Sequence, residues 1–415
     1  MIKSIGNDSP HLIVFEKASM FLLAVYPILN AYTLFGIITV AQTISCILFI
    51  CGLSSKRSRL KIYPTFFLIF WGYATIHLLL FSGNFKITYL FPGGISFCLY
   101  AISLGLFCKY YSSSYLYKYL KWVLIFAVVL FIYQYLIFII TGTHISVFLP
   151  ISDTVQYSVT SYSELVKIQM SYEDRFASIF LEPSYFGQYA LIVLTVELFK
   201  KENKNKLCTP FAVFIVIIEL LIKSGVGLLG LVFVALIKLI YVLFGGKQKK
   251  KLLILFVLFP IIFWSVDYYL NSDIGIGVAN RISLETNSDG ELTDQSANER
   301  IIYGFWEYYR LDDLDKIIGT SISNRTEIGM RNTAINGFSD SLITYGWIGT
   351  IILLTFYYKA CYRGSLIVVA FGILLLVVSF VETILFDDFM LLCTVIILNE
   401  GKNNSCLSYT KRVKI

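Results

Sequence analysis

Charged residues are scarce in this sequence. Asp, Glu, Lys and Arg make up 15% of its 415 residues, whereas a soluble domain carries about a quarter. Histidine occurs 3 times, and none of the 8 cysteines lies in the two long polar segments, so no disulfide framework or zinc-ligand spacing can be drawn. This composition excludes a soluble multidomain enzyme, a disordered chain and a collagen-like fibre.

Long apolar runs make up most of the chain instead. Apolar residues account for 57% of the sequence, and the mean hydropathy is +0.73. Runs of about 20 residues between charged positions predict about twelve transmembrane helices, because the runs are continuous and do not alternate as barrel strands do. The sequence therefore predicts an all-α, polytopic integral membrane protein. The predicted spans are 12–30, 34–53, 62–82, 88–108, 122–141, 186–199, 207–222, 226–244, 252–270, 338–358, 365–385 and 388–400.

Basic residues predict the orientation of these spans. With both termini in the cytoplasm, most of the 34 lysines and arginines fall in inner segments, as the positive-inside tendency requires. The net charge of +7 is then explained by topology, and no basic solvent domain for nucleic acid remains. The predicted units are helices 1–5 in 1–141, a long outer loop in 142–185, helices 6–9 in 186–270, a second long outer loop in 271–337, and helices 10–12 with a cytoplasmic tail in 338–415.

The first long loop ends in a charged and aromatic stretch, Asp174 to Ala190, directly before a predicted span. Arg175 has the planar fork that holds two oxygens of a phosphate. Glu182 is a candidate base, since partial burial would raise the pKa of its carboxyl group. Pro183 fixes the turn into the helix, and Gly187 leaves room for a close approach. The alternative is an ion pair of Arg175 with Asp174 or Glu182 that only holds the loop.

The second long loop contains a predicted surface helix. Ser296 and Glu299 have the spacing of a capping box, and the stretch 300–316 repeats apolar and aromatic residues at helical spacing. An amphipathic helix at the outer membrane surface would place Arg300 near the level of lipid headgroups. Arg300 would then contact either the pyrophosphate of a lipid substrate or ordinary lipid phosphates.

Four stretches together resemble the bacterial O-antigen and capsule repeat-unit polymerases, which share a superfamily with the O-antigen ligases. They are Asp174 to Ala190, Lys223 to Leu231, Asn298 to Arg300, and Asn336 to Gly346. The resemblance implies a glycosyltransferase of the bacterial plasma membrane that joins oligosaccharide repeat units carried on undecaprenyl pyrophosphate. It also implies membrane lipid as a partner, with a chain-length regulator protein as a further one.

The same resemblance implies which residues act. Arg175 and Arg300 match external arginines that hold the donor pyrophosphate. Arg331 is added to them for its position just before the tenth span, not by the resemblance. Asn336 matches the asparagine of a His-Asn pair, but Ile335 occupies the histidine position. If the reaction needs a general base, a carboxylate must therefore act as that base.

We expect Glu182 to act as the base, with Asp340 as the second choice. Lys223 would face the cavity where a pyrophosphate arrives; the simpler alternative is that it neutralises Glu219, which lies four residues before it in a predicted span.

Neither a metal nor another cofactor is predicted. Asp313 and Asp315 have the spacing of an Asp-x-Asp metal motif, but a solvated acidic turn explains them better. Two other functions remain open. An O-antigen ligase would transfer finished glycan to another acceptor, and the missing histidine counts against it. A polysaccharide or lipid-linked sugar transporter would need functional charges deep in the bundle, whereas here they gather at the outer boundary.

Overall fold

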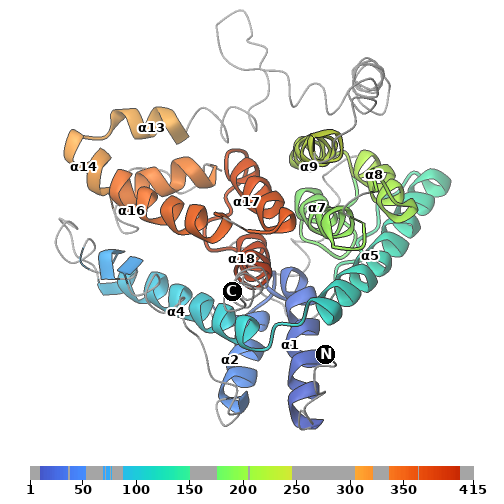
Figure 1. The fold of residues 1–415 in the computed structure, drawn as a ribbon, viewed down its shortest axis with the longest axis horizontal. Helices are drawn as coiled ribbons and strands as arrows, with labels where there is room; N and C mark the ends of the chain where they lie inside the picture. Colours follow the sequence, from blue (N-terminus) through green and yellow to red (C-terminus); the bar gives the residue numbers. More distant parts are fainter. Residues whose placement is uncertain are drawn as a thin grey trace, which may run out of the picture.

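The computed structural model of the protein describes residues 10–35, 38–52, 69–70, 72–74, 76, 87–149, 175–203, 206–244, 304–320, 336–362 and 364–401. This part of the chain is mostly helical (Figure 1). Its helices are α1 (Pro10–Leu29), α2 (Val40–Gly52), α4 (Ile87–Lys109), α5 (Ser113–Thr141), α7 (Pro183–Phe199), α8 (Pro210–Ile222), α9 (Gly225–Phe244), α13 (Gly304–Arg310), α14 (Asp313–Ile318), α16 (Gly337–Cys361), α17 (Leu366–Ser379) and α18 (Asp388–Glu400).

Among the described residues, four helical stretches are long and apolar enough to cross a membrane: Leu12–Leu29 in α1, Ser113–Thr141, Gly225–Val242 in α9 and Gly337–Cys361. This confirms a helical membrane protein but not twelve spans. Helices α2, α8 and α18 have 13 residues each, about 20 Å at 1.5 Å per residue, which is less than the roughly 30 Å of a hydrocarbon core. The predicted span 252–270 lies outside the described residues, as does most of 62–82.

The predicted second span, 34–53, begins differently. A short antiparallel pair, β1 (Thr33–Phe35) and β2 (Ile38–Thr39), precedes α2, so the helix starts only at Val40. The side chain of Thr39 donates a 2.9 Å hydrogen bond to Asn30, which closes the turn after α1. Hydropathy alone cannot separate these apolar strand residues from the helix that follows, because the run is continuous.

Polar residues at the helix ends explain where several spans begin and end. Thr209, Asn336 and Asp387 each occupy an N-cap position and accept a hydrogen bond from a backbone N–H of the first turn. Pro210 follows the first of these caps and has the fixed φ that suits a first helical position. Gly142 ends α5 in the left-handed conformation, with φ of 66°, which costs glycine no steric strain.

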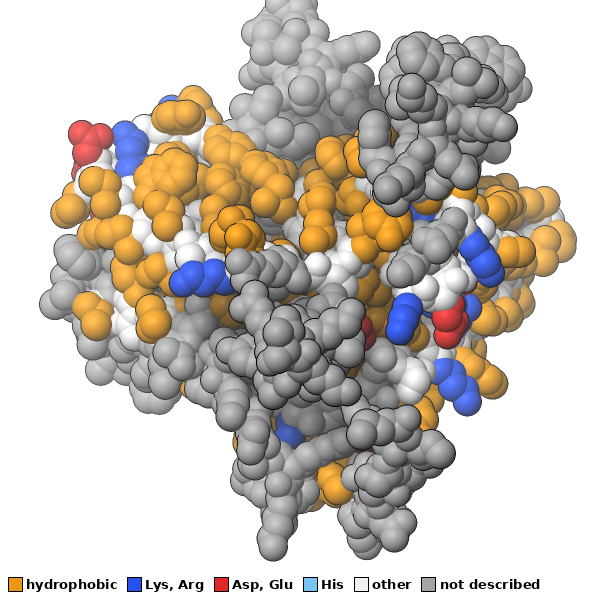
Figure 2. All heavy atoms as spheres, viewed as in Figure 1, with side chains coloured by type: hydrophobic (Ala, Val, Ile, Leu, Met, Phe, Trp, Pro, Cys, Tyr) orange, Lys and Arg blue, Asp and Glu red, His pale blue; other side chains and the backbone are white. Residues whose placement is uncertain are grey.

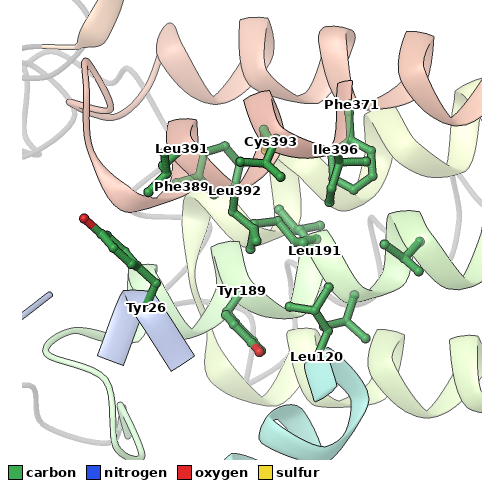
Figure 3. Close-up of a cluster of buried hydrophobic side chains, with 14 of the residues drawn as sticks. Tyr26, Leu120, Tyr189, Leu191, Phe371, Phe389, Leu391, Leu392, Cys393 and Ile396 are labelled. Atoms are coloured by element: carbon green, nitrogen blue, oxygen red, sulfur yellow. The ribbon is translucent and has the colours of Figure 1, made fainter. Parts of the chain in front are cut away.

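Helix α7 is the centre of the packing. All of its residues except Ser184 and Tyr185 are buried, as expected for a helix that is apolar all round. It packs against α5, α8, α9, α17 and α18. Side chains of α1, α5, α7, α17 and α18 meet in the core (Figure 3). The labelled ones include Tyr26, Leu120, Tyr189, Leu191, Phe371, Phe389 and Ile396.

The outer surface is apolar as well. Hydrophobic side chains cover much of the described surface in Figure 2, with few acidic or basic groups between them. On α5, Trp122 is 67% exposed and Ile140 is 79% exposed. Exposed apolar area on this scale is unusual for a monomer in water and is what a surface in contact with lipid requires.

Basic residues gather at one end of the bundle. Lys121 and Lys200 each lie 3.0 Å from Oε2 of the buried Glu197, near the end of α7. Lys238 of α9 donates to the backbone oxygens of Leu198, at 2.6 Å, and of Asn203, at 3.0 Å. Lys121 and Lys200 belong to segments predicted to face the cytoplasm, and Lys238 lies near the inner end of its predicted span, so the structure brings predicted inner segments to a common end.

Two short helices occupy much of the stretch 300–316, where one surface helix was predicted. α13 and α14 are separated at Leu311 and Asp312, and both pack on α16. The capping box at 296–299 lies outside the described residues. Trp306 and Tyr309 of α13 are exposed, which agrees with an amphipathic element at a membrane surface.

Helix α16 is broken at Gly346. This residue has φ of 62° and ψ of −171°, a combination that is essentially restricted to glycine. Gly319, after α14, lies against the break: a Cβ atom there would come 2.6 Å from the backbone N of Gly346. The hydroxyl of Tyr73 is 2.8 Å from the carbonyl oxygen of Tyr345, and the backbone N–H of Thr320 donates to Ile343 at 2.8 Å. These bonds satisfy backbone oxygens that the break removes from the helix ladder.

Candidate functional site

Four of the six predicted site residues lie in the described part of the chain: Arg175, Glu182, Lys223 and Asp340. Arg300 and Arg331 lie outside the described residues.

The segment before α7 is fixed to α5 by buried polar contacts. Ser178 lies in the left-handed region, with φ of 54°, and its backbone N–H donates a 3.0 Å hydrogen bond to the side-chain oxygen of Gln134. Its hydroxyl donates to the backbone oxygen of Ala127 at 2.6 Å. Phe176 stacks on His144, with ring centroids 5.2 Å apart. Arg175, next in sequence to Phe176, is therefore carried by a well-packed backbone, not by a freely moving loop.

Glu182 stands at the start of α7. Its backbone is extended and occupies the N-cap position, but its side chain does not cap the helix. Instead, a carboxylate oxygen accepts a 3.0 Å hydrogen bond from the hydroxyl of Ser184. Glu182 is only partly buried. The N-terminal end of α7 also favours negative charge, through the unpaired N–H groups of its first turn.

Lys223 lies close to the same end of α7. It terminates α8 in the left-handed conformation, with φ of 56°. Its neighbour Ser224 packs against α7: a Cβ atom at Gly187 would lie 3.1 Å from Cβ of Ser224. The structure thus brings Glu182 and Lys223, which are distant in sequence, to one end of the α7, α8 and α9 group.

The expected pairing of Glu219 with Lys223 is not found. The carboxylate of Glu219 is fully buried and has no hydrogen-bond partner among the described residues. The left-handed turn at Lys223 explains the difference, because it ends the helical spacing on which a contact between residues four apart depends.

Asp340 lies apart from this group. It belongs to the first turns of α16, is buried, and accepts a 3.1 Å hydrogen bond from the hydroxyl of Thr344. Helix α17 packs against both α16 and α7 and lies between them in Figure 1. The two predicted bases therefore belong to different parts of the bundle, and Glu182, which is only partly buried, is less enclosed than Asp340.

An apolar cavity of about 80 Å³ lies beside the start of α16. It is enclosed by α16, α17 and α18, and its lining includes Gly337, Ser341, Leu354, Leu376 and Met390. Leu354 and Leu376 are 36% and 47% exposed, so the cavity adjoins the apolar surface. It suits hydrocarbon better than a sugar, because its lining offers little hydrogen bonding.

The turn before α18 carries acidic groups. Glu382 and Asp387 are near each other there, and the backbone oxygen of Glu382 accepts a 2.8 Å hydrogen bond from the N–H of Gly337. Burial, together with the adjacent carboxylate of Asp388, raises the pKa of Asp387 well above its usual value. These residues tie the start of α16 to the turn between α17 and α18.

The Asp-x-Asp sequence lies on α14. The carboxylate of Asp313 is fully exposed and lies 3.4 Å from the ammonium group of Lys316. Within the described residues, no group of three or more His, Cys, Asp and Glu side chains has the arrangement of a metal site.

Gln134 is the residue of this site that the sequence analysis missed. It is a single amide inside the apolar run of α5, and it joins α5 to the segment that carries Arg175. A lone amide in a predicted span is a recognisable signal, because a polar group in the membrane interior needs a partner.

The fold defines the class of the protein: its apolar helices fit an all-α membrane protein. Comparisons with known protein families, with curated proteins and with solved structures found no match for this chain.

Proposed function

We propose that this protein polymerises undecaprenyl-pyrophosphate-linked oligosaccharide repeat units into O-antigen or capsular polysaccharide at the outer face of the bacterial plasma membrane. The observation that carries the proposal is the arrangement around α7. A fixed segment holds Arg175, the start of the helix presents Glu182, and the α8–α9 turn brings Lys223 to the same end. Cations and a partly buried carboxylate at a bundle end suit a lipid-linked diphosphate and a sugar hydroxyl.

The proposed reaction requires few catalytic groups from the protein. The donor sugar is already activated by its pyrophosphate, so the enzyme must align two lipid-linked chains, stabilise charge on the leaving phosphates and deprotonate one hydroxyl. Arg175 and Lys223 would bind the pyrophosphate, with Arg300 and Arg331 completing the set. Glu182 would accept the proton from the attacking hydroxyl. The apolar cavity between α16 and α18 offers hydrocarbon contact of the kind that a polyprenyl chain needs.

The decisive experiment supplies purified protein with a matching undecaprenyl-pyrophosphate repeat unit, with and without a chelator. A ladder of polysaccharide lengths in both reactions is the expected result. A single transfer to a different acceptor would favour a ligase, and transport across vesicles without any ladder would favour a transporter. If wild type forms no ladder, the proposed activity is wrong; a ladder lost only with the chelator overturns only the metal-independent chemistry.

Arg175→Ala should slow polymer formation by at least about tenfold, because one cation that stabilises the leaving pyrophosphate is lost. Arg175→Lys should restore only part of the rate, since lysine lacks the bidentate fork. The rate of ladder growth at saturating donor measures both effects.

Arg310→Ala is the matched control. Arg310 belongs to the same predicted outer region, but it is exposed, stacks on Trp306 and lies 3.7 Å from Glu307. We expect a rate close to that of wild type. An equal loss in the two variants, or no loss in Arg175→Ala, would remove Arg175 from the proposed site.

A further inference from the structure

Glu219 is an ionisable group for which the proposed chemistry has no use. It lies on α8, where no atom of the residue is exposed to solvent. Both of its carboxylate oxygens are buried and have no hydrogen-bond partner among the described residues. If Glu219 were ionised, its carboxylate would lose its hydration without gaining a compensating hydrogen bond. Such a buried charge is very unfavourable in a membrane protein interior.

Two glycines make the space that this side chain occupies. A Cβ atom at Gly227 of α9 would collide with Oε2 of Glu219, and a Cβ atom at Gly187 of α7 would lie 3.2 Å from the same oxygen. Ser224 closes the remaining side, and its hydroxyl accepts a 3.2 Å hydrogen bond from the backbone N–H of Gly227. The carboxyl group of Glu219 is therefore held where α7, α8 and α9 meet.

No charged group of the described part of these helices is placed to compensate the charge. Glu197 follows Gly187 by ten residues on α7 and Lys238 follows Gly227 by eleven on α9, about 15 Å along a helix in each case. Lys223 is nearest in sequence, but it does not pair with Glu219. The other titratable residues on the packed helices are Tyr185, Tyr189 and Tyr241, and Tyr189 donates its hydroxyl hydrogen bond to Ala24 of α1.

We propose that Glu219 is a proton-binding site, whose bound proton keeps the carboxyl group neutral and the junction of α7, α8 and α9 closed. Loss of the proton would place an uncompensated charge between Gly187 and Gly227. Water or a cation would have to enter to solvate that charge, and the three helices would have to separate to admit it. The close packing is then present while Glu219 is protonated and is lost as the pH rises.

Infrared difference spectroscopy between wild type and Glu219→Gln, at neutral pH in detergent or lipid, tests the proposal directly. The wild-type spectrum should contain the C=O stretch of a protonated carboxyl group that the variant lacks. If the difference contains the bands of an ionised carboxylate instead, the proposal is wrong. Glu197→Gln is the control: Glu197 lies between two lysines, so its removal should delete ionised-carboxylate bands.

Thermal unfolding gives the second measurement. The Tm of wild type should fall between neutral and alkaline pH by more than the Tm of Glu219→Gln, because glutamine keeps the shape of the acid and cannot ionise. Equal pH profiles in the two proteins would show that no proton at Glu219 holds the junction.

A pair of glycine variants keeps the test available if Glu219→Gln does not fold. Gly227→Ala would press a methyl group against the carboxyl of Glu219, and we expect it to shift the wild-type C=O band and lower the Tm. Gly225→Ala, two residues earlier on α9, meets nothing within 4 Å and should leave both unchanged. The same band position in Gly227→Ala and wild type would contradict the proposed place of the proton.

Discussion

Gly346→Ala is expected to lower the free energy of unfolding by about 3 kcal/mol or more, the sum of backbone strain and overpacking. The φ of 62° and ψ of −171° suit glycine alone. A Cβ atom would also come 2.5 Å from the carbonyl carbon of Ile317 and would strike the backbone N of Gly319. Backbone atoms cannot rotate aside as a side-chain end can, so α14 would have to leave its place on α16. Unfolding by heat or by a denaturing detergent, followed by circular dichroism, measures the loss.

Gly142→Ala separates the two causes of that loss. Gly142 also has a positive φ, of 66°, but a Cβ atom there would meet nothing within 4 Å. Only left-handed strain remains, which costs about 1 kcal/mol. If the two variants lost equal stability, the contact between Gly319 and Gly346 would contribute nothing, and the packing of α14 on α16 would have to be described differently.

The break at Gly346 shows what hydropathy cannot predict. The run 338–358 was predicted as one span, and α16 does cover it, from Gly337 to Cys361. Nothing in the run of apolar residues indicates a left-handed residue in its middle, because the break depends on Gly319, which is distant in sequence. The spans predicted at 88–108 and 226–244 correspond closely to α4 and α9. Helix α5 begins at Ser113, nine residues before the predicted span 122–141, because Lys118 and Lys121 interrupt the apolar run without ending the helix.

For the candidate site, the sequence indicates the charged residues but not the contacts that position them. Arg175, Glu182 and Lys223 stand out in the sequence because they are charged groups at the edges of apolar runs. Their positioning contacts are less visible: Gln134 joins α5 to the segment before α7, and the close approach at Gly187 comes from Ser224 and Glu219, which are distant in sequence. The pairing expected between Glu219 and Lys223 was wrong for the same reason, since a left-handed turn at Lys223 is not visible in residue spacing.

Glu197 differs from Glu219 in that its buried carboxylate has several hydrogen-bond and ion-pair partners. Besides the two lysines, it accepts hydrogen bonds on Oε1 from Asn203 at 2.9 Å and from Thr209 at 3.1 Å. Lys121 also lies over the ring of Phe211, 4.2 Å from its centroid. The carboxylate thus joins α5, α7 and the loop into α8. Its contacts explain why a charged residue is tolerated so near the end of a buried helix.

Glu197→Ala is therefore expected to lower the free energy of unfolding by about 2–3 kcal/mol. The value is below that of a fully buried pair, because Lys121 and Lys200 are 35% and 23% exposed and can turn to solvent. Glu202→Ala, at an exposed position in the same loop, should change stability by less than about 0.5 kcal/mol. Both values follow from detergent-induced unfolding under one set of conditions. Similar values for the two variants would mean that the lysines, and not the carboxylate, hold this end of the bundle together.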